Sequence, residues 1–242
     1  MLKQPMNYLR AVMLWTAVCG AATAADGWAD LFNGKDLNGW IQRGGKATFA
    51  AEEGCIVGTS TPNTPNSFLC TSRDYADFIM EYEFKVDPRL NSGVQIRSQC
   101  FDTPVAFEWR GQTIKIAAGV VHGYQIEIDP DPKRDRWWTG GLYDESARDW
   151  LYPGRLGGDG KTFTAQGRQI FKQGDWNKIR VEAVGDSIKT TLNGTVCVDT
   201  RDSRVPSGFF GLQVHNISGD DSKTGSQVRW RNLRIQELAV KE

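Results

Sequence analysis

The sequence predicts an all-β protein built from two antiparallel sheets that stack face to face. Several segments alternate apolar and polar residues with a period of two, the pattern of strands that bury one face only. No stretch of about 12 residues carries the 3.6-residue period of an amphipathic helix. The 242 residues also include 26 glycines and 9 prolines. Such a content suits many turns between short strands.

The alternating segments give the expected strands in chain order. They cover residues 78–86, 92–98, 123–129, 177–184, 187–192, 208–215 and 227–238. Asn193-Gly194 follows the fifth segment and is a dipeptide that favours a two-residue hairpin turn. In the last segment the apolar positions change phase after Trp230, which predicts a bulge near Arg231-Asn232. One or two helical turns are expected only at residues 144–151.

The same alternation predicts the side chains that fill the space between the sheets. The expected core residues are Phe78, Met80, Phe84, Val94, Ile96, Ile126, Ile128, Ile179, Val181, Leu212 and Val214. Two shorter extended segments carry Cys55 and Cys70 and are joined by the turn-rich residues 59–66. With Cys100 and Cys197 the expected mature chain has four cysteines, which allow three pairings. A hairpin at residues 59–66 would favour the Cys55–Cys70 disulfide. Four buried thiols are the alternative.

Residues 1–24 are predicted to be a secretory signal peptide. Lys3 and Arg10 give the basic start, residues 11–18 form a short apolar run, and Ala22-Thr23-Ala24 is a small-residue cleavage site. The apolar run is shorter than the roughly 20 residues that span a bilayer. A lipid on Cys19 is disfavoured because a large valine precedes it. We therefore expect an exported protein, periplasmic or secreted.

Residues 25–242 are expected to form a single domain, because no linker, repeat or change in composition interrupts them. The 29 basic and 29 acidic residues give a formal net charge of zero. This balance argues against nucleic acid as a partner, since phosphate-binding domains usually carry a basic excess. No other segment resembles a membrane span, and the sequence leaves the oligomeric state open.

The polar faces of three expected strands predict a binding groove. Their outward residues are Gln95 and Arg97, then Gln125, Glu127 and Asp129, then Gln213 and His215. These faces lack the lysines of an ordinary solvated strand. Gly93, Gly123 and Gly211 share them and would let a ligand approach the backbone. Such a lining suits a polyhydroxylated small molecule, although a polar face with satisfied hydrogen bonds is the alternative.

Seven motifs follow one another along the chain. They are DLFNGKDLNGW at 30–40, NSGVQIR at 91–97, GYQIEID at 123–129, TGGLY at 139–143, GDWN at 174–177, LNG at 192–194 and GLQVH at 211–215. In order and spacing they resemble the 3-keto-disaccharide hydrolase domain family, over residues 27–238. The resemblance implies a concanavalin-like jelly-roll sandwich and action on 3-keto-glycosides. The commoner family pattern reads Gly-Tyr-Glu-x-Gln, whereas Gln125 and Glu127 exchange those two residue types here.

The chemistry of such a substrate defines what the site needs. A ketone at C3 of a sugar acidifies the hydrogen on C2. Once a base removes that proton, the group on C1 departs by elimination, and water added to the resulting enone completes a net hydrolysis. The site therefore needs a base near C2 and hydrogen-bond donors for the developing enolate.

Glu127 and His215 are the candidate bases, because both have the outward parity of their strands, whereas His122 is expected on the core side. Arg97 is the third candidate catalytic residue, as a charged donor that orients the keto group. The candidate substrate-binding residues are Gln95, Gln125, Gln213, Asn91, Tyr143 and Asp129. No compact ligand motif is present, so no cofactor is required, although a divalent metal on Glu127 or Asp129 and His215 is an alternative.

Two other functions fit the same groove. A conventional glycosidase needs two carboxylates about 5–10 Å apart. Glu127 with Asp129, Glu81 or Glu83 would supply them. A sugar-binding module without catalysis is the other alternative. Activity on 3-keto and unmodified glycosides separates the three, and the sequence specifies neither the aglycone nor the anomer.

The signal peptide gives a testable prediction. Because Ala22-Thr23-Ala24 is the expected cleavage site, the exported protein should begin near Ala25. N-terminal sequencing of the exported protein measures this directly. Exported material that begins at Met1 would contradict it.

Overall fold

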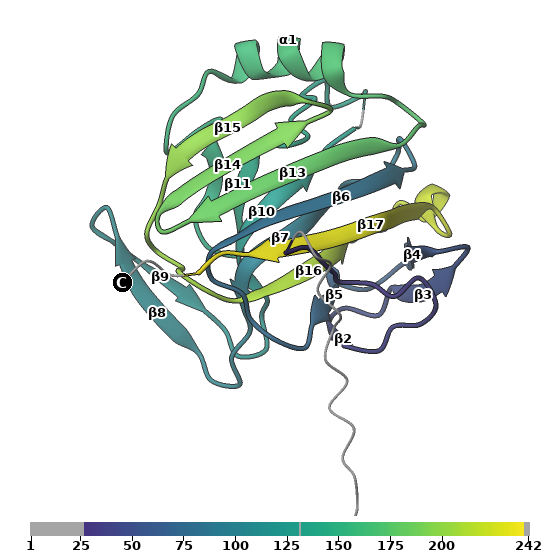
Figure 1. The fold of residues 1–242 in the computed structure, drawn as a ribbon, viewed down its shortest axis with the longest axis horizontal. Helices are drawn as coiled ribbons and strands as arrows, with labels where there is room; N and C mark the ends of the chain where they lie inside the picture. Colours follow the sequence, from purple (N-terminus) through teal and green to yellow (C-terminus); the bar gives the residue numbers. More distant parts are fainter. Residues whose placement is uncertain (1–26, 131, 240–242) are drawn as a thin grey trace, which may run out of the picture.

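The computed structural model describes residues 27–130 and 132–239 and shows two antiparallel sheets packed face to face (Figure 1). The eight-stranded sheet runs β15 (Thr195–Arg201), β14 (Ser187–Leu192), β13 (Asn177–Val184), β6 (Phe78–Val86), β17 (Gln227–Glu237), β4 (Cys55–Thr59) and β3 (Thr48–Glu52), with β1 (Ala29–Asp30) paired to β17. The seven-stranded sheet runs β12 (Asp149–Tyr152), β11 (Leu142–Glu145), β10 (His122–Ile128), β7 (Ser92–Gln99), β16 (Phe209–Val214), β5 (Ser67–Thr71) and β2 (Trp40–Gly44). The predicted all-β sandwich is confirmed.

Three smaller elements complete the described chain. They are the hairpin of β8 (Val105–Trp109) and β9 (Gln112–Ile116), the helix α1 (Gly160–Ile170) and the short 3₁₀ helix η1 (Asp221–Lys223). The helix α1 lies beside β15 (Figure 1), where Gln166 Nε2 donates to the Val196 carbonyl at 2.7 Å. Its Phe163 packs edge-on against Tyr152 of β12. The helix therefore covers the end of the sandwich between the edge strands of both sheets.

The helix was not predicted, and the helical turns expected at residues 144–151 are wrong. That segment contains the end of β11, the turn at Ser146 and the start of β12, and Ser146 and Asp149 have positive φ. In α1 the Asp159 side chain caps the first turn by accepting from the Thr162 N–H at 2.8 Å. Only Phe163 and Gly167 of the helix are buried. Phe163, Gly167 and Ile170 recur at helical spacing, so the signal was present, but the helix has 11 residues and is shorter than the stretch of about 12 on which the sequence prediction relied.

The predicted core is confirmed. Its eleven residues are at most 2% exposed, and they are Phe78, Met80, Phe84, Val94, Ile96, Ile126, Ile128, Ile179, Val181, Leu212 and Val214. Each burial removes apolar surface from water, which is the main favourable term in folding. Trp230 of β17 and Phe210 of β16 are fully buried in the same cluster. The inner faces of both sheets are thus apolar, and the polar side chains are left to the outer faces.

The predicted bulge in β17 is also confirmed. Pairing with β6 shifts between Arg231 and Arg234, and Asn232 adopts a φ of 52°. The extra residue reverses the alternation, so Leu233 and Ile235 are buried on the same side as Trp230. The predicted Asn193-Gly194 turn likewise joins β14 to β15, with positive φ at both residues.

A second bulge, in β7, overturns the position predicted for Arg97. Gln95 pairs with Gly211 of β16, yet Ser98 pairs with Phe209, so β7 contains one residue more than its neighbour over this span. Arg97 sits at this irregularity with a φ of 46°. The sequence prediction of a groove-facing side chain is therefore wrong, because the bulge turns Arg97 away and returns Ser98 to the outer face.

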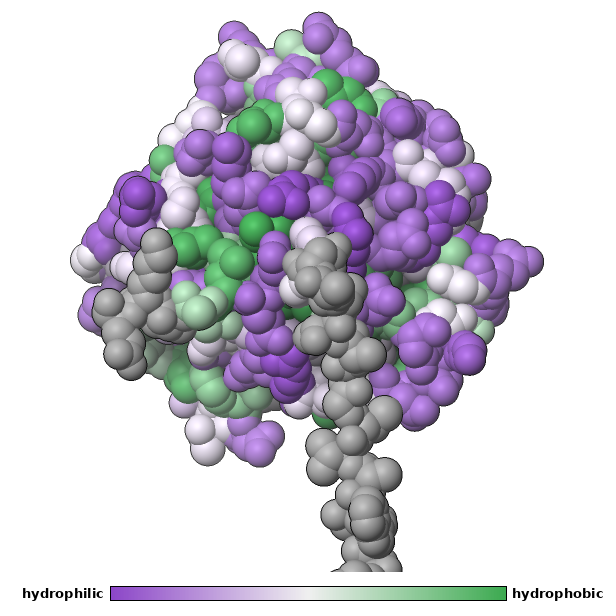
Figure 2. Space-filling view, in the orientation of Figure 1, coloured by the Kyte–Doolittle hydropathy of each residue, from purple (hydrophilic) through white to green (hydrophobic). Residues whose placement is uncertain are grey.

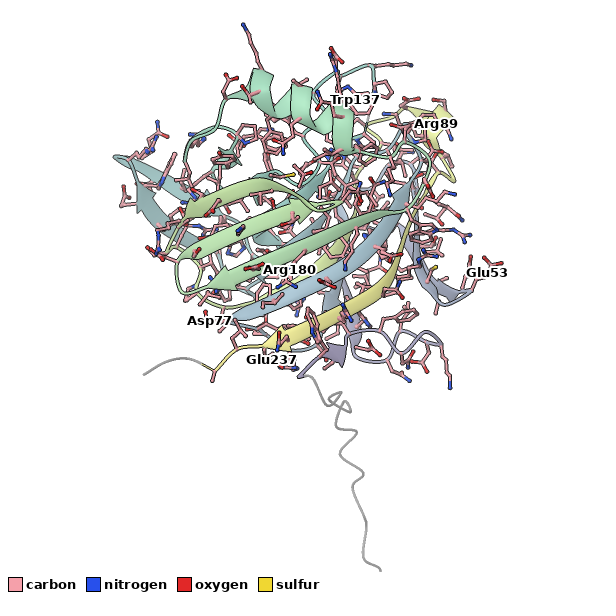
Figure 3. All side chains as sticks on the ribbon, turned by 45° about the horizontal axis from the view of Figure 1, so that its top comes forward. Glu53, Asp77, Arg89, Trp137, Arg180 and Glu237 are labelled. Atoms are coloured by element: carbon pink, nitrogen blue, oxygen red, sulfur yellow. The ribbon has the colours of Figure 1, made fainter. Side chains whose placement is uncertain are left out.

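The buried Arg97 side chain connects the two sheets instead. Its guanidinium lies 3.0 Å from Asp77, which begins the turn into β6 of the other sheet (Figure 3). It also donates to the backbone carbonyls of Ala76 and Gly185, both at 2.7 Å. The Arg97 side chain is fully buried, so these contacts satisfy a charge that water does not reach.

The Cys55–Cys70 disulfide predicted from the sequence is wrong, since all four cysteines of the described chain are free thiols. Cys55 belongs to β4 of the eight-stranded sheet and Cys70 to β5 of the seven-stranded sheet. The turn-rich residues between them pass from one sheet to the other rather than forming a hairpin. Burial raises the pKa of the Cys70 thiol to about 12, which keeps this thiol protonated and unreactive.

The outer face of the eight-stranded sheet is charged and largely hydrophilic (Figure 2). Glu81 of β6 accepts from Arg180, Lys178 and Arg234, and Arg180 stands on this face in Figure 3. Burial alone would raise the pKa of Glu81, but these three cations lower it to about 2. Glu83 pairs with Arg231 on the same face. Both carboxylates are therefore on the wrong sheet to pair with Glu127.

No helix among the described residues is long and apolar enough to span a membrane.

The contacts of Arg97 generate a stability prediction. Arg97→Met should lower the free energy of unfolding by about 3 kcal/mol, because it leaves the Asp77 carboxylate and two carbonyls without their buried donor. The exposed ion pair Arg201–Asp186 supplies the control, and Arg201→Met should cost less than about 1 kcal/mol. Urea denaturation measures both. Equal losses for the two variants would show that the connection between the sheets contributes nothing.

Candidate functional site

A polar cavity of about 270 Å³ opens on the outer face of the seven-stranded sheet. It is lined by Asn66, Asn91, Gln125, Glu127, Arg134, Arg136, Tyr143, Glu145, Trp150 and His215. These residues come from several strands and from the loops that follow them. The cavity is near the lower end of the usual size for small-molecule sites, so it suits a ligand of about one sugar ring.

The strand register explains how the polar residues reach the cavity. Glu127 of β10 pairs with Gly93 of β7, which in turn pairs with Gln213 of β16. One step along, Gln125 pairs with Gln95. All four polar residues share the outer face. A Cβ on Gly93 would lie 2.5 Å from the Gln125 side chain. This glycine therefore makes room for Gln125. The sequence had suggested that it makes room for a ligand.

The Glu127 carboxylate is held by two side-chain amides. Asn91 Nδ2 donates to one carboxylate oxygen at 2.5 Å, and Gln125 Nε2 donates to the other at 2.9 Å. Gln125 is held in turn by Gln95, whose Nε2 donates to it at 2.6 Å, and Ser98 donates to Gln95 at 2.7 Å. Glu127 thus ends a continuous chain of amides across the sheet, with its orientation set from behind.

A second carboxylate, Glu145 at the end of β11, faces the same cavity and was not predicted. Asn66 Nδ2 donates to one of its oxygens at 3.2 Å, and Gln213 Nε2 donates to the other, also at 3.2 Å. Asn66 is positioned by Asn216, whose backbone N–H donates to it at 2.9 Å. Glu145 and Glu127 therefore share one arrangement, a carboxylate gripped by two amides.

Burial raises the pKa of both carboxyl groups. For Glu127 burial is the largest cause, the charge of Asp129 adds to it, and the bonds from Asn91 and Gln125 oppose it, which leaves the pKa at about 7. For Glu145 burial also dominates, against the bonds from Asn66 and Gln213. A carboxyl group that titrates near neutral pH is suited to proton transfer.

Cations and aromatic rings complete the cavity wall. Arg136 holds Asp129 through Nε at 2.8 Å, and its guanidinium lies 5.1 Å from the centre of the Trp150 ring. Arg134 lines the same side. The Tyr143 hydroxyl donates to Asp149 at 3.3 Å, and its ring packs edge-on against Trp150. The basic and aromatic residues after β10 therefore form part of the cavity.

His215 follows β16 and reaches the cavity, whereas His122 does not line it. Burial lowers the pKa of His215, and the charge of Arg134 lowers it further, so the imidazole is neutral at pH 7. Its Nδ1 lies 2.7 Å from the backbone carbonyl of Asn216. This contact assigns the hydrogen to Nδ1 and leaves Nε2 as an acceptor.

The structure divides the residues predicted for the site into three groups. Glu127, His215, Gln125, Asn91 and Tyr143 line the cavity. Gln95, Gln213 and Asp129 lie behind it and hold lining residues. Arg97 lies elsewhere, as described above. Of the residues that the sequence did not assign, Glu145 has the same strand parity as Tyr143, whereas Asn66 and Trp150 carried no signal.

Two other kinds of site, a metal-binding group and a larger hollow, are alternatives to this cavity. Within residues 27–130 and 132–239, no three or more His, Cys, Asp or Glu side chains are grouped to bind a metal ion. A larger hollow of about 750 Å³ lies beside β4 and β17. Its arginines are engaged by neighbouring groups, Arg231 by Glu83 and Trp176, and Arg89 by Asp87. The smaller cavity is the one that contains carboxyl groups with raised pKa values.

The family comparison covers nearly all of the described chain. The model of the 3-keto-alpha-glucoside-1,2-lyase-like domain matches residues 27–236. Among curated protein sequences, none matches this chain. The family match supports a carbohydrate-active role.

Solved structures share the fold. A presumptive glycosyl hydrolase from Parabacteroides distasonis is 18% identical, with a TM-score of 0.54 over 89% of this chain and 95% of that one. A Bacillus subtilis protein of unknown function with a galectin-like fold is 8% identical, with a TM-score of 0.53 over 85% and 92%. The carbohydrate-binding module CBM66 from B. subtilis is 18% identical, with a TM-score of 0.50 over 82% and 96%. At these identities the likenesses establish the concanavalin-like jelly-roll fold alone.

The raised pKa of Glu127 gives a prediction about pH and stability. Its folded value of about 7 exceeds the ordinary 4.5, so the folded protein binds more protons than the unfolded chain between these pH values. Stability should therefore fall as pH rises from about 4.5 to about 7. Glu127→Gln removes this loss, and its stability relative to wild type should rise by about 1–3 kcal/mol between pH 5 and pH 8.

Urea denaturation at the two pH values measures the difference. Glu108→Gln, on the exposed β8–β9 hairpin, makes the same chemical change outside the cavity and should leave the pH dependence as in wild type. A pH dependence for Glu127→Gln that matches wild type would show that Glu127 ionises normally.

Proposed function

The chain belongs to the 3-keto-alpha-glucoside-1,2-lyase-like domain family, and from this premise we propose that it cleaves 3-keto-glycosides after export from the cytoplasm. The observation that carries the proposal is the Glu127 carboxyl group, buried in a cavity that suits one sugar ring, with a pKa of about 7. A base for carbon acids must hold and release a proton near the working pH. Glu127 meets that condition.

In this proposal Glu127 removes the proton on C2 of the 3-keto sugar. The electron pair of the broken C–H bond moves into a C2–C3 enolate. The bond from C1 to the leaving oxygen then breaks, and addition of water to the enone gives net hydrolysis. Asn91 and Gln125 grip both oxygens of the carboxylate, which fixes the direction in which Glu127 can accept the proton.

The developing enolate needs positive charge or N–H donors near the C3 oxygen. Arg97 cannot provide them, because it lies between the sheets. Arg136 and Arg134 line the cavity instead. Arg136 already carries a carboxylate partner in Asp129, which holds the guanidinium in place before substrate arrives. We assign enolate stabilisation to these two arginines, and contact with the sugar ring to Trp150.

His215 is the second candidate base. Its lowered pKa keeps the ring neutral, and Nε2 is left to accept a proton or a sugar hydroxyl. The His215 ring is held by a backbone carbonyl, whereas Glu127 is held by two side-chain amides. The better-fixed group is the better base, so we assign C2 deprotonation to Glu127 and hydroxyl binding to His215.

A conventional glycosidase is the second candidate function, and one observation favours it. Glu127 and Glu145 both face the cavity, which supplies a carboxylate pair in place of Glu81 and Glu83. A hydrolase of this kind would cleave unmodified glycosides. A protein that only binds sugars would cleave neither class. Turnover of matched 3-keto and unmodified glucosides by the wild-type protein separates the three functions, and we expect turnover of the 3-keto substrate alone.

Substitution of Glu127 tests its role. Glu127→Gln keeps the shape of the side chain and removes its basicity, so turnover of a 3-keto-glucoside should fall at least ~10²-fold. His215→Ala should lose less, since the histidine binds a hydroxyl. Glu108→Gln is the matched control and should keep wild-type turnover. Steady-state kinetics on folded variants measure all three.

The opposite pattern would reassign the chemistry. A large loss for His215→Ala with near wild-type turnover for Glu127→Gln would make His215 the base. Near wild-type turnover for both variants would show that this cavity is not the reaction site.

A further inference from the structure

The two carboxyl groups of the cavity are built alike, but the function proposed above uses only one. Glu127 is gripped by Asn91 and Gln125, and Glu145 by Asn66 and Gln213. In both, a separate amide donates to each oxygen. Glu145 is thus oriented by the same arrangement as the proposed base, through longer hydrogen bonds of 3.2 Å.

The surroundings of Glu145 disfavour two ionised carboxylates. Its cavity also contains the buried carboxyl group of Glu127, and desolvation raises the pKa of both groups, so two negative charges there are unfavourable. The remaining charged or titratable groups that face it are Arg134, Arg136, Tyr143, His215 and, from behind, Asp129 and Asp144. Arg136 is paired with Asp129. The charge of Glu145 contributes to the raised pKa of Glu127, so ionisation of one group disfavours ionisation of the other.

We propose that Glu145 is a further catalytic residue, the acid that protonates the departing glycosidic oxygen. This rests on the function proposed above. The geometry that carries it is the presence of two amide-held carboxyl groups in one cavity of about 270 Å³. A sugar ring bound there lies within reach of both groups, one for the C2 hydrogen and one for the oxygen on C1.

The proton and electron balance is complete without another reactant. Glu127 takes the C2 proton and becomes a carboxylic acid. The enolate electrons then form the C1–C2 double bond and restore the C3 carbonyl as the C1–O bond breaks. The leaving oxygen takes the proton of Glu145 and departs as an alcohol. In hydration, the Glu145 carboxylate removes a proton from water as its oxygen adds to C1, and Glu127 returns its proton to C2.

The other polar groups of the cavity are less suited to this step. The Tyr143 hydroxyl already donates to Asp149, and burial raises its pKa, so it is a weak acid. The neutral His215 presents an acceptor rather than a donor. Arg134 and Arg136 remain protonated in proteins and cannot give up a proton.

Leaving groups of different acidity test the assignment. A methoxide leaving group needs a proton, whereas 4-nitrophenolate departs without one. Glu145→Gln should therefore lower kcat/KM at least ~10²-fold on methyl 3-keto-glucoside and less than ~10-fold on 4-nitrophenyl 3-keto-glucoside. Glu108→Gln should leave both unchanged. Equal losses on the two substrates, or no loss on either, would overturn the proposal.

Two further readouts keep the test decisive. In D₂O, Glu145→Gln should still exchange the C2 hydrogen of the methyl substrate, whereas Glu127→Gln should not. If Glu145→Gln does not fold, the wild-type pH profiles serve instead: kcat/KM should fall at high pH for the methyl substrate and reach a plateau for the nitrophenyl substrate. Matching profiles would contradict an acid role. A wild-type protein that cleaves neither keto substrate would instead refute the proposed function itself, and this inference with it.

Discussion

Two carboxyl groups on the outer face of one sheet, Glu127 buried and Glu145 half-buried, are the constraint around which the rest of this molecule is arranged. A carboxylate without water or partners is strongly unfavourable in a protein interior. Here each is offset by two amides, and Gln95 and Ser98 extend the support behind Glu127. The amides oppose the rise in pKa that burial causes in both groups, and the pKa of Glu127 is left at about 7. Such a balance serves proton transfer better than a salt bridge would.

That arrangement depends on the backbone of β7, the strand that lies between β10 and β16 in the seven-stranded sheet. Gly93 leaves the space that the Gln125 side chain occupies. Four residues later the bulge at Arg97 adds a residue, so that Ser98 returns to the outer face to support Gln95 while Arg97 turns inward. One strand therefore supports the cavity on one side and connects the sheets on the other. A change that removed the bulge would disturb both.

The outer faces of the two sheets differ in their charged neighbours. The eight-stranded sheet shows solvent a face of paired charges, in which Glu81 is surrounded by cations and its pKa falls to about 2. On the seven-stranded sheet Glu127 is held by two neutral amides, and its pKa rises to about 7. The same residue type thus has a lowered pKa on one sheet and a raised pKa on the other. Burial and the sign of the neighbouring charges decide which.

The sequence alone determined the features that depend on local alternation. Strand parity placed Phe78, Ile126 and Leu212 in the core and Glu127 on the polar face, and a change of phase located the bulge in β17. Tertiary structure decided what alternation does not record. The bulge in β7 causes no visible change of phase, because few apolar positions follow it, and so the direction of Arg97 was missed. Glu145 reaches Gln213 across strands that the sequence does not order, and the cysteines fell on different sheets for the same reason. Parity is a property of one strand, whereas a site requires the pairing of several.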